Sequence, residues 1–248
     1  LEDIDYTRCK SHYENQIIKD LRWLGIKWNG QVMKQRNRRK FYAAGLDELK
    51  QAGLIYPCSC TRNDIKHAVS APHKDDTSLI VYPGTCLKNP PTKGITALRL
   101  NIKKALQVVD RKELYFYDLG FPKGQRSEKQ IIHHDHLLNK FGDLIIARKD
   151  IGTSYNLSVV IDDASQNISH ITRGFDLLDV TPIQVLLQKL LSIKTPFYYH
   201  HALLCDQSGK KLSKRTNSDS VLGLKERGIS ATEVIEMALN HRHKKLEF

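Results

Sequence analysis

Short apolar segments alternate with a helical pattern in the second half of the chain, and this alternation limits the folds that the chain can adopt. The pattern predicts strands at residues 142–150, 155–163, 168–174 and 198–206. Between the last two, Thr181 precedes Pro182 and a stripe of apolar residues at helical spacing, which predicts a helix capped by Thr181. Strands that alternate with helices favour an α/β fold with parallel strands.

The first half and the C-terminal end add further elements. Helical stripes occupy residues 8–24 and 38–52, alternating patterns predict strands at residues 96–102 and 113–119, and residues 120–129 resemble a loop. Near the C-terminus, Gly228 is expected to end one short helix, and Ser230 with Glu233 forms a capping box at the start of another.

The charge of the chain points to a polyanionic partner. Its 248 residues hold 39 Lys and Arg against 27 Asp and Glu, a formal net charge of +12 that is spread along the sequence. Such a balance is typical of proteins that bind nucleic acid or phosphate-rich substrates, although a solubility surface has the same composition. No apolar run approaches the length of a membrane span, so we expect a cytoplasmic protein with no membrane partner.

Three of the five cysteines mark a candidate zinc site. Cys58 and Cys60 form a C-x-C pair, and Cys86 follows Tyr82 in "YPGTC". Residues 63–96 are polar and irregular, and a metal would explain how such an insertion stays folded. The fourth donor is open: Tyr82, a water, or one of two histidines, His67 and His73. Three ordinary thiols are the alternative, and Cys9 and Cys205 resemble small core residues.

Other groups of polar residues are weaker candidates for a site. The "HHDH" run at residues 133–136 lies in a helix-like stretch, where adjacent histidines point in different directions. His200 and His201 are expected to face opposite sides of a strand, so that one of them can line a cleft. Asp162 and Asp163 are predicted to have a structural role at the end of a strand rather than to bind a metal.

A lysine-rich loop at residues 210–215 is the candidate for phosphate binding. Its sequence "KKLSKR" follows a predicted strand, and Lys214 is placed to reach a triphosphate and stabilise a departing pyrophosphate. The chain contains neither a G-x-x-x-x-G-K-[ST] loop nor a G-x-G-x-x-G loop. On its own, the segment is equally compatible with a solvated basic turn.

Several motifs together resemble one family. "KLSKR" is similar to the KMSKS signature of class I aminoacyl-tRNA synthetases. The motifs of glutamyl-tRNA synthetase catalytic domains occur here in the same order: "LEDID", "DLRWLGIKWNG", "GLIYPCSCTR", "YPGTC", "SYNLSVVIDD", "ITRGFDLL" and "TPIQVLLQKLL". The match covers nearly the whole chain. Within this family, the chain looks most like the short paralogues called glutamyl-Q tRNA(Asp) synthetases, as "RGFDLLDVTPIQ" and the few residues after the lysine loop suggest.

The resemblance implies a set of site residues. Glu2 would accept the ammonium group of L-glutamate, and Tyr155 and Arg173 would complete the amino-acid pocket. Lys214 would act in catalysis on the ATP phosphates. The implied ATP loop is Lys211, Leu212, Ser213, Lys214 and Arg215, and the implied ligands of one structural zinc ion are Cys58, Cys60, Tyr82 and Cys86.

The resemblance also implies an organisation and an activity. We expect a Rossmann-like class I core: its N-terminal half at residues 1–57, a zinc-binding insertion at 58–96, the rest of the insertion and second half of the core at 97–215, and a C-terminal helical segment at 216–248. The family's HIGH-type opening segment does not precede Leu1, so the first strand–helix–strand unit is expected to be incomplete and the natural protein to start earlier.

The implied reaction is the ATP- and Mg²⁺-dependent activation of glutamate and its transfer to the queuosine base of tRNA(Asp), by a monomer. One alternative is a truncated glutamyl-tRNA synthetase that charges tRNA(Glu). Another is a catalytically incomplete, zinc-containing RNA-binding fragment. The tRNA that accepts glutamate separates the first two, and ATP–pyrophosphate exchange separates both from the third.

Overall fold

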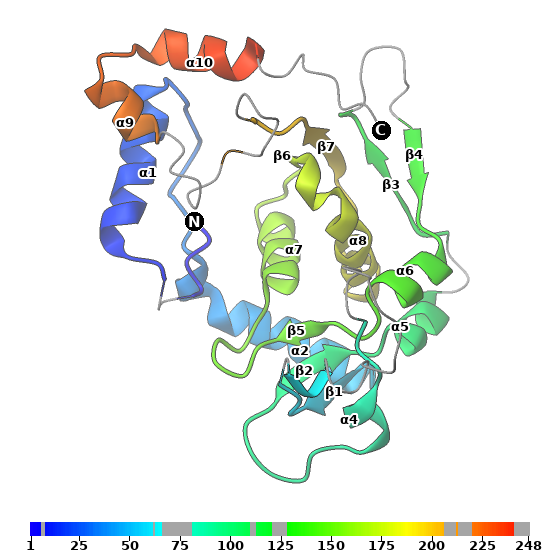
Figure 1. The fold of residues 1–248 in the computed structure, drawn as a ribbon. Helices are drawn as coiled ribbons and strands as arrows, with labels where there is room; N and C mark the ends of the chain where they lie inside the picture. Colours follow the sequence, from blue (N-terminus) through cyan, green and yellow to red (C-terminus); the bar gives the residue numbers. More distant parts are fainter. Residues whose placement is uncertain are drawn as a thin grey trace. The chain divides into compact units, whose positions relative to one another are not determined.

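The computed structural model describes residues 1–5, 8–61, 63–65, 81–109, 113–120, 128–205, 212 and 220–240, and it groups them into two compact units. One unit comprises Leu1–Asn37, Thr172–Leu177 and His200–Phe248, and the other comprises Arg38–Ile171 and Leu178–Tyr199. The elements along the chain are as follows (Figure 1): α1 (Ser11–Trp23), η1 (Gln35–Arg38), α2 (Arg39–Gln51), β1 (Ile55–Cys58), α4 (Thr85–Lys88), β2 (Ala97–Leu100), α5 (Ile102–Val109), β3 (Tyr115–Asp118), β4 (Glu128–Ile131), α6 (His134–Lys140), β5 (Ile145–Ala147), α7 (Tyr155–Ser165), β6 (His170–Gly174), η2 (Phe175–Val180), α8 (Thr181–Leu190), β7 (Phe197–His201), α9 (Val221–Glu226) and α10 (Ala231–Asn240).

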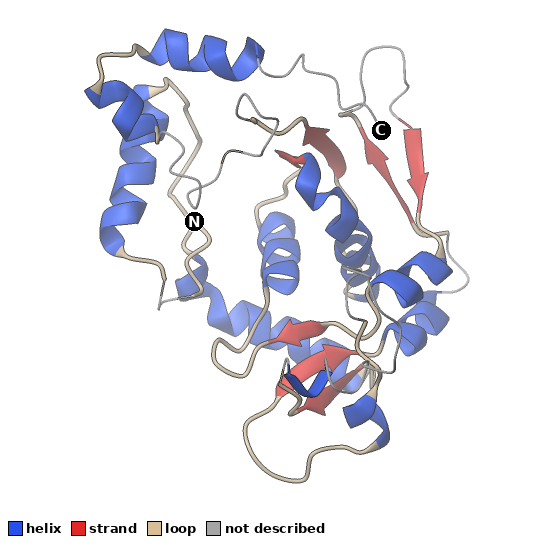
Figure 2. Cartoon of the chain, in the orientation of Figure 1, coloured by secondary structure: helices blue, strands red, loops and turns tan. Residues whose placement is uncertain are grey.

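A three-stranded sheet of order β1-β2-β5 carries the cysteine region, and both of its strand pairs are antiparallel. The register sets Cys58 opposite Ala97 and Tyr56 opposite Arg99. Since residues two apart on a strand share a face, this register brings the side chains of Tyr56, Cys58 and Arg99 to the same side of the sheet. Figure 2 shows the short helix α4 beside these strands.

The second sheet has the order β4-β3-β7-β6. Strand β3 pairs with β7 in parallel, with Asp118 opposite Tyr198, and this confirms parallel pairing in the α/β core. Strand β3 also pairs with β4 in antiparallel register, with Tyr117 opposite Lys129. The loop predicted for residues 120–129 is therefore wrong at its end, because residues 128 and 129 belong to β4 and are held there by ladder hydrogen bonds.

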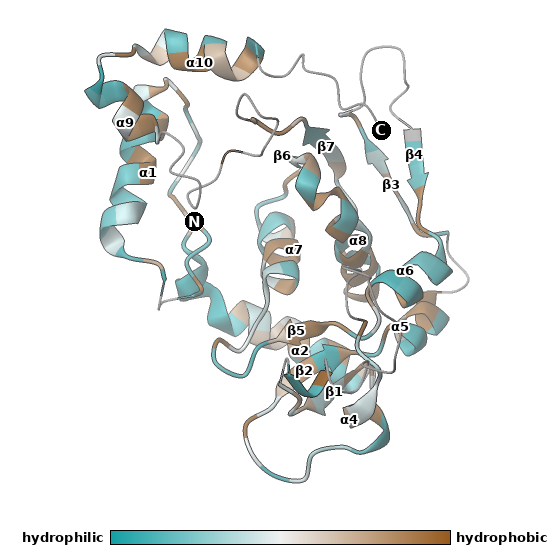
Figure 3. Ribbon diagram, viewed as in Figure 1, coloured by the Kyte–Doolittle hydropathy of each residue, from teal (hydrophilic) through white to brown (hydrophobic). Residues whose placement is uncertain are grey.

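Helix α8 forms the centre of the larger unit, packing against α7, α5 and β3 (Figure 1). Ile183, Val185, Leu186 and Leu187 are all fully buried, and Figure 3 shows brown, apolar residues along this helix. The predicted helix is confirmed, but the predicted cap is wrong. The N-cap residue is Val180 and Thr181 is the first helical residue, because the preceding turn η2 runs directly into the helix.

The segment at residues 155–163 is the helix α7 and not the predicted strand. Ser154 caps the helix by accepting a hydrogen bond from the backbone N–H of Leu157, at 3.4 Å. The local run of β-branched residues favours a strand, but Leu157, Val160, Ile161 and Ala164 recur at helical spacing and place one face against α8 and α2. Packing against α8 and α2, rather than local β-strand propensity, therefore determines that this segment is a helix.

Helix α7 also buries Asp162, so its predicted place at a strand end is wrong, while its predicted structural role is confirmed by its contacts. Its carboxylate accepts hydrogen bonds from Arg38 Nε at 2.5 Å and from the Tyr42 hydroxyl at 2.8 Å. Burial, followed by the contact with Asp162, raises the pKa of Tyr42 above its usual range. The three side chains connect α7 to the start of α2.

The smaller unit contains α1, α9 and α10. Buried Asp3 accepts hydrogen bonds from the backbone N–H of Arg36, at 2.8 Å, and from its guanidinium. Gly228, with a φ of +81°, follows the end of α9, and Ser230 and Glu233 form the predicted capping box at the start of α10. Among the described residues, no helix has the length and apolar character that crossing a membrane requires.

Candidate functional site

Three cysteines and a tyrosine from separate segments meet at one end of the three-stranded sheet. Cys58 ends β1, Cys60 lies two residues further on, and Cys86 lies in α4. The thiol sulfurs all lie within 4.8 Å of one another. The Tyr82 hydroxyl oxygen lies 3.5 Å from the sulfurs of both Cys58 and Cys60, and it accepts a hydrogen bond from the backbone N–H of Cys86 at 2.7 Å.

A glycine makes the position of Tyr82 possible. Tyr82 forms a parallel bridge with Gly142, which has a φ of +54°. A Cβ at residue 142 would approach Val81 Cγ1 to 2.5 Å, closer than packed atoms allow. The positive φ and the clash with the Val81 side chain therefore favour glycine at this position, next to the backbone of Tyr82.

Three distances between these donors can be compared with those of a tetrahedral zinc site. Zinc binds thiolate sulfur at about 2.3 Å and oxygen at about 2.1 Å, so tetrahedral geometry separates two sulfurs by about 3.8 Å and a sulfur from an oxygen by about 3.6 Å. The observed distances are 3.3 Å between Cys60 and Cys86 and 3.5 Å from Tyr82 to both Cys58 and Cys60. In donor type and in spacing, the residues fit the metal.

The side chains of this cluster differ in the direction in which their pKa values are shifted. Burial raises the pKa of the Cys86 thiol, but hydrogen bonds from Tyr82, Cys60 and two backbone N–H groups outweigh it and lower this pKa to about 6. Burial and the neighbouring Cys86 raise the pKa of Cys60 to about 11, against an opposing hydrogen bond from Tyr82. Burial and hydrogen bonds with Cys58 and Cys86 raise the pKa of Tyr82 above its usual range. The cluster thus favours one thiolate before any cation binds.

Sequence reasoning missed Arg99, which the structure places beside the cysteines. Its side chain is buried, with 4% of the residue exposed. Arg99 Nε donates a hydrogen bond to Cys58 Sγ at 3.1 Å, and the guanidinium lies over the ring of Tyr82. A cation between Leu98 and Leu100 in a short apolar strand is a signal that could have identified it.

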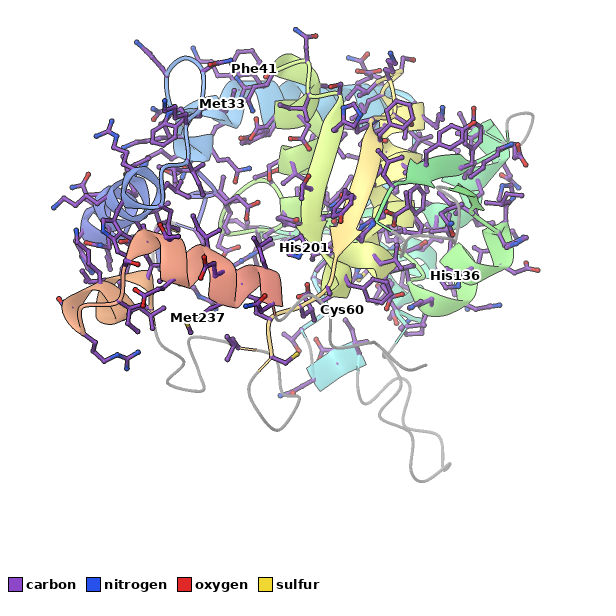
Figure 4. The ribbon with its side chains drawn as sticks, turned by 90° about the horizontal axis from the view of Figure 1, so that it is seen from above. Met33, Phe41, Cys60, His136, His201 and Met237 are labelled. Atoms are coloured by element: carbon purple, nitrogen blue, oxygen red, sulfur yellow. The ribbon has the colours of Figure 1, made fainter. Side chains whose placement is uncertain are left out.

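The remaining histidine and cysteine candidates stay outside this cluster where the structure describes them. Helix α6 carries the end of the "HHDH" run, and Figure 4 shows His136 away from Cys60. Within the described ranges, the one group of His, Cys, Asp and Glu that is spaced for a metal ion is Cys58, Cys60 and Cys86. His67 and His73 lie outside the described residues. Cys9 and Cys205 are half-buried rather than core residues.

The three residues predicted to bind glutamate belong to two different units. Glu2 is exposed in the smaller unit, and Tyr155 is half-buried as the first residue of α7 in the larger unit. Arg173, on β6 in the smaller unit, donates a hydrogen bond from Nε to His200 Nε2 at 3.2 Å. His200 is buried and His201 half-buried on β7, which confirms that they face opposite sides.

The predicted phosphate loop lies almost entirely outside the described residues. Lys211, Ser213, Lys214 and Arg215 are not described. Leu212 is exposed, and its backbone N–H donates a hydrogen bond to the carbonyl of Leu204 at 2.9 Å, within the smaller unit.

Comparison with known sequences finds one family over nearly the whole chain. The sequence model described as "tRNA synthetases class I (E and Q), catalytic domain" matches residues 1–239. A curated relative from Rhodobacter capsulatus, named glutamyl-Q tRNA(Asp) synthetase, is 40% identical over 244 residues, covering 94% of this chain and 84% of the relative. A relative of the same name from Thiobacillus denitrificans is 38% identical over 237 residues, covering 94% and 70%.

Solved structures with this fold include two glutamate–tRNA ligases. The one from Elizabethkingia meningosepticum, in complex with its amino acid, superposes with a TM-score of 0.61 at 20% identity, covering 87% of this chain and 44% of that chain. The one from Elizabethkingia anophelis superposes with a TM-score of 0.62 at 20% identity, covering 86% and 45%. The chain therefore spans less than half the length of these solved chains, and the likeness concerns the fold alone.

Proposed function

Because the chain belongs to the class I tRNA synthetases (E and Q), we propose that it activates glutamate with ATP and transfers it to the queuosine base of tRNA(Asp). The observation that carries this proposal is the similarity, over 94% of this chain, to two relatives that are both named glutamyl-Q tRNA(Asp) synthetase. The net charge of +12 supports an RNA substrate, since lysine and arginine side chains neutralise backbone phosphates.

The proposed chemistry has two steps. The α-carboxylate of glutamate attacks the α-phosphorus of Mg²⁺-bound ATP, and a carboxyl–phosphate bond forms as the bond to pyrophosphate breaks. A hydroxyl of the queuosine cyclopentene ring then attacks the acyl carbon, forming an ester and releasing AMP. The protein contributes mainly by positioning the reactants and stabilising the negative charge that develops on phosphate oxygens.

Four residues have roles in the proposed substrate site. Glu2 accepts the ammonium group of glutamate, and Tyr155 lines the pocket. Arg173 offers a planar fork of donors that suits a carboxylate, and its contact with His200 supports this role because it fixes the orientation of the guanidinium on β6. Lys214, in the loop from Lys211 to Arg215, neutralises the ATP phosphates.

The proposed zinc ion would be structural. Cys58, Cys60, Tyr82 and Cys86 would hold it, and their spacing supports this ligand set. When bound, zinc would supply folding free energy to a region with few apolar residues. The proposed metal takes no part in the acyl transfer.

Glutamate-dependent exchange of pyrophosphate into ATP tests the activation step. It is measured on residues 1–248. We expect exchange with glutamate, and a loss of about 100-fold or more in Lys214→Ala, the scale typical of losing one preorganised charge-stabilising donor. Lys103→Ala, at an exposed lysine of α5, is the matched control and is expected to keep full activity. No exchange with glutamate would contradict an enzymatic function of this chain.

The identity of the acceptor separates the proposal from its alternatives. We expect transfer of glutamate to tRNA(Asp) that contains queuosine and none to the same tRNA without it. Charging of tRNA(Glu) would instead indicate a truncated glutamyl-tRNA synthetase, and RNA binding without exchange would indicate a zinc-containing binding fragment. The cytoplasmic location and the monomeric state remain predictions from the sequence.

A further inference from the structure

Arg99 is a charged side chain buried beside the cysteine cluster. It lies in the middle of the short strand β2 (Ala97–Leu100), and 4% of the residue is exposed. A buried guanidinium is strongly disfavoured unless an anion or a set of hydrogen-bond acceptors compensates its charge. The groups in contact with Arg99 therefore indicate how its buried charge is compensated.

The partners of Arg99 include two candidate metal ligands. Its Nε donates a hydrogen bond to Cys58 Sγ at 3.1 Å, and its guanidinium carbon lies 3.7 Å from the centroid of the Tyr82 ring. One terminal nitrogen donates to the backbone carbonyl of Asp143 at 2.6 Å. Within the described part of the chain, Arg99 forms no ion pair with a carboxylate.

The carboxylate of Asp143 is engaged in other contacts. Its Oδ2 accepts a hydrogen bond from the Tyr56 hydroxyl at 2.6 Å, and its Oδ1 accepts one from the backbone N–H of Ile102 at 2.9 Å. Asp143 thus fixes β1 and the start of α5, and it orients its own carbonyl towards Arg99. The group of the cysteine cluster in hydrogen-bond contact with the guanidinium is the Cys58 sulfur, which would carry a negative charge as a thiolate ligand of a bound metal.

The net charge of the zinc-bound cluster would favour a cation beside it, such as the Arg99 guanidinium. Zinc carries two positive charges and three thiolates carry three negative charges, so the centre has a net charge of −1 with a neutral phenol and −2 with a phenolate. A buried anionic centre is stabilised by a fixed positive charge in contact with it. Arg99 is a guanidinium in hydrogen-bond contact with one of these sulfurs and stacked on the ring of the fourth donor.

We propose that Arg99 is a positioning and charge-balancing residue of the metal centre, which strengthens zinc binding by neutralising the thiolates and by holding Cys58 and the Tyr82 ring in place. The inference rests on the proposed zinc site. It goes beyond that site because it assigns a determinant of metal affinity to a residue that is not a ligand. Arginine suits this position because its planar fork bonds to sulfur and carbonyl at once while its face covers an aromatic ring.

The test measures zinc affinity by competition with a chromophoric chelator. Arg99→Met and Arg99→Gln remove the charge, Arg99→Lys keeps it, and Arg148→Met is the matched control at an exposed arginine. We expect the two neutral variants to bind zinc about 10- to 100-fold more weakly, the range found when outer contacts to metal ligands are removed. Arg99→Lys keeps the charge but loses the planar fork, so its affinity is expected to lie between those of the neutral variants and the wild type, and Arg148→Met is expected to bind like the wild type.

Cobalt substitution gives a readout that a purely structural role would not change. Loss of the hydrogen bond to Cys58 Sγ makes that sulfur more electron-rich, so the sulfur-to-cobalt charge-transfer band of Arg99→Met is expected to move to longer wavelength. If the neutral variants are unfolded without metal, the zinc concentration that drives folding, followed by circular dichroism, gives their relative affinity.

The possible results separate the proposed role of Arg99 from the proposed zinc site on which it rests. Folded neutral variants that bind zinc as tightly as the wild type, with an unchanged cobalt band, would overturn the role of Arg99 and leave the metal site intact. A wild-type chain that takes up no stoichiometric zinc would overturn both the site and the inference. Weaker binding in the neutral variants, with partial recovery in Arg99→Lys, supports the proposal.

Discussion

The contact between Tyr42 and Asp162 allows a quantitative test of how α7 is fixed to α2. Tyr42 is 1% exposed, and its hydroxyl donates to Asp162 Oδ2 at 2.8 Å. Tyr42→Phe removes this hydroxyl and keeps the ring, so no large cavity forms. A buried hydrogen bond to a charged acceptor contributes about 1.5–3 kcal/mol, and we expect the free energy of unfolding to fall by that amount.

Removal of the acceptor is expected to cost more than removal of the donor. Asp162→Ala leaves the Arg38 guanidinium without its carboxylate while the Arg38 side chain is 12% exposed. Breaking one partner of a buried ion pair destabilises a protein by about 3–5 kcal/mol. Asp162→Ala is therefore expected to lower the free energy of unfolding more than Tyr42→Phe, because it leaves the Arg38 charge without its partner.

Urea unfolding followed by far-UV circular dichroism measures both variants under the same conditions. Tyr199→Phe, at a tyrosine that is 38% exposed, is the control and is expected to stay within about 0.5 kcal/mol of the wild type. A Tyr42→Phe variant as stable as Tyr199→Phe would refute the reasoning. So would an Asp162→Ala variant less affected than Tyr42→Phe.

Three further predictions concern the proposed metal centre. Removal of zinc by a chelator is expected to lower the thermal midpoint of the wild type, and to have little effect on Cys86→Ser, as differential scanning fluorimetry would show. The pKa of Cys86 falls from its ordinary 9.0 to about 6. Its contribution to the stability of the metal-free chain is therefore full above about pH 9 and is lost as the pH falls through about 6. The urea concentration at the midpoint of unfolding should rise with pH across this window in the wild type and change less in Cys86→Ser. Gly142→Ala places a Cβ 2.5 Å from Val81 Cγ1 at a φ of +54°, so it is expected to displace Tyr82 and weaken zinc binding in the chelator competition; unchanged affinity would contradict the role given to this glycine.

The three cysteines of the proposed metal site could be selected from residue types, whereas the fourth donor stayed open and Tyr82 was implied only by the family resemblance. Cysteines at C-x-C spacing, with a third cysteine four residues after a tyrosine, have few other uses in a chain with an odd number of cysteines. The role of Arg99 could not be predicted in this way, because Arg99 and Cys58 are 41 residues apart and meet through the register of β1 and β2. Such a register depends on tertiary packing.

The α/β class and the resemblance to class I synthetases are confirmed, while some local elements are wrong. Residues 155–163 contain a β-branched run that favours a strand, and only burial against α8 and α2 selects the helix. The helical spacing of Leu157, Val160 and Ile161 was present in the sequence. The predicted glutamate pocket and ATP loop remain predictions, since Lys214 lies outside the described residues.

The position of the transferred glutamate on tRNA tests the proposed function most directly. Labelled glutamate is transferred to tRNA(Asp) that contains queuosine, and nuclease digestion then separates the fragment that carries queuosine from the 3′-terminal fragment. We predict that the label stays with the queuosine fragment and is absent when the tRNA lacks the modification. Label on the 3′-terminal adenosine, or on tRNA(Glu), would contradict the account.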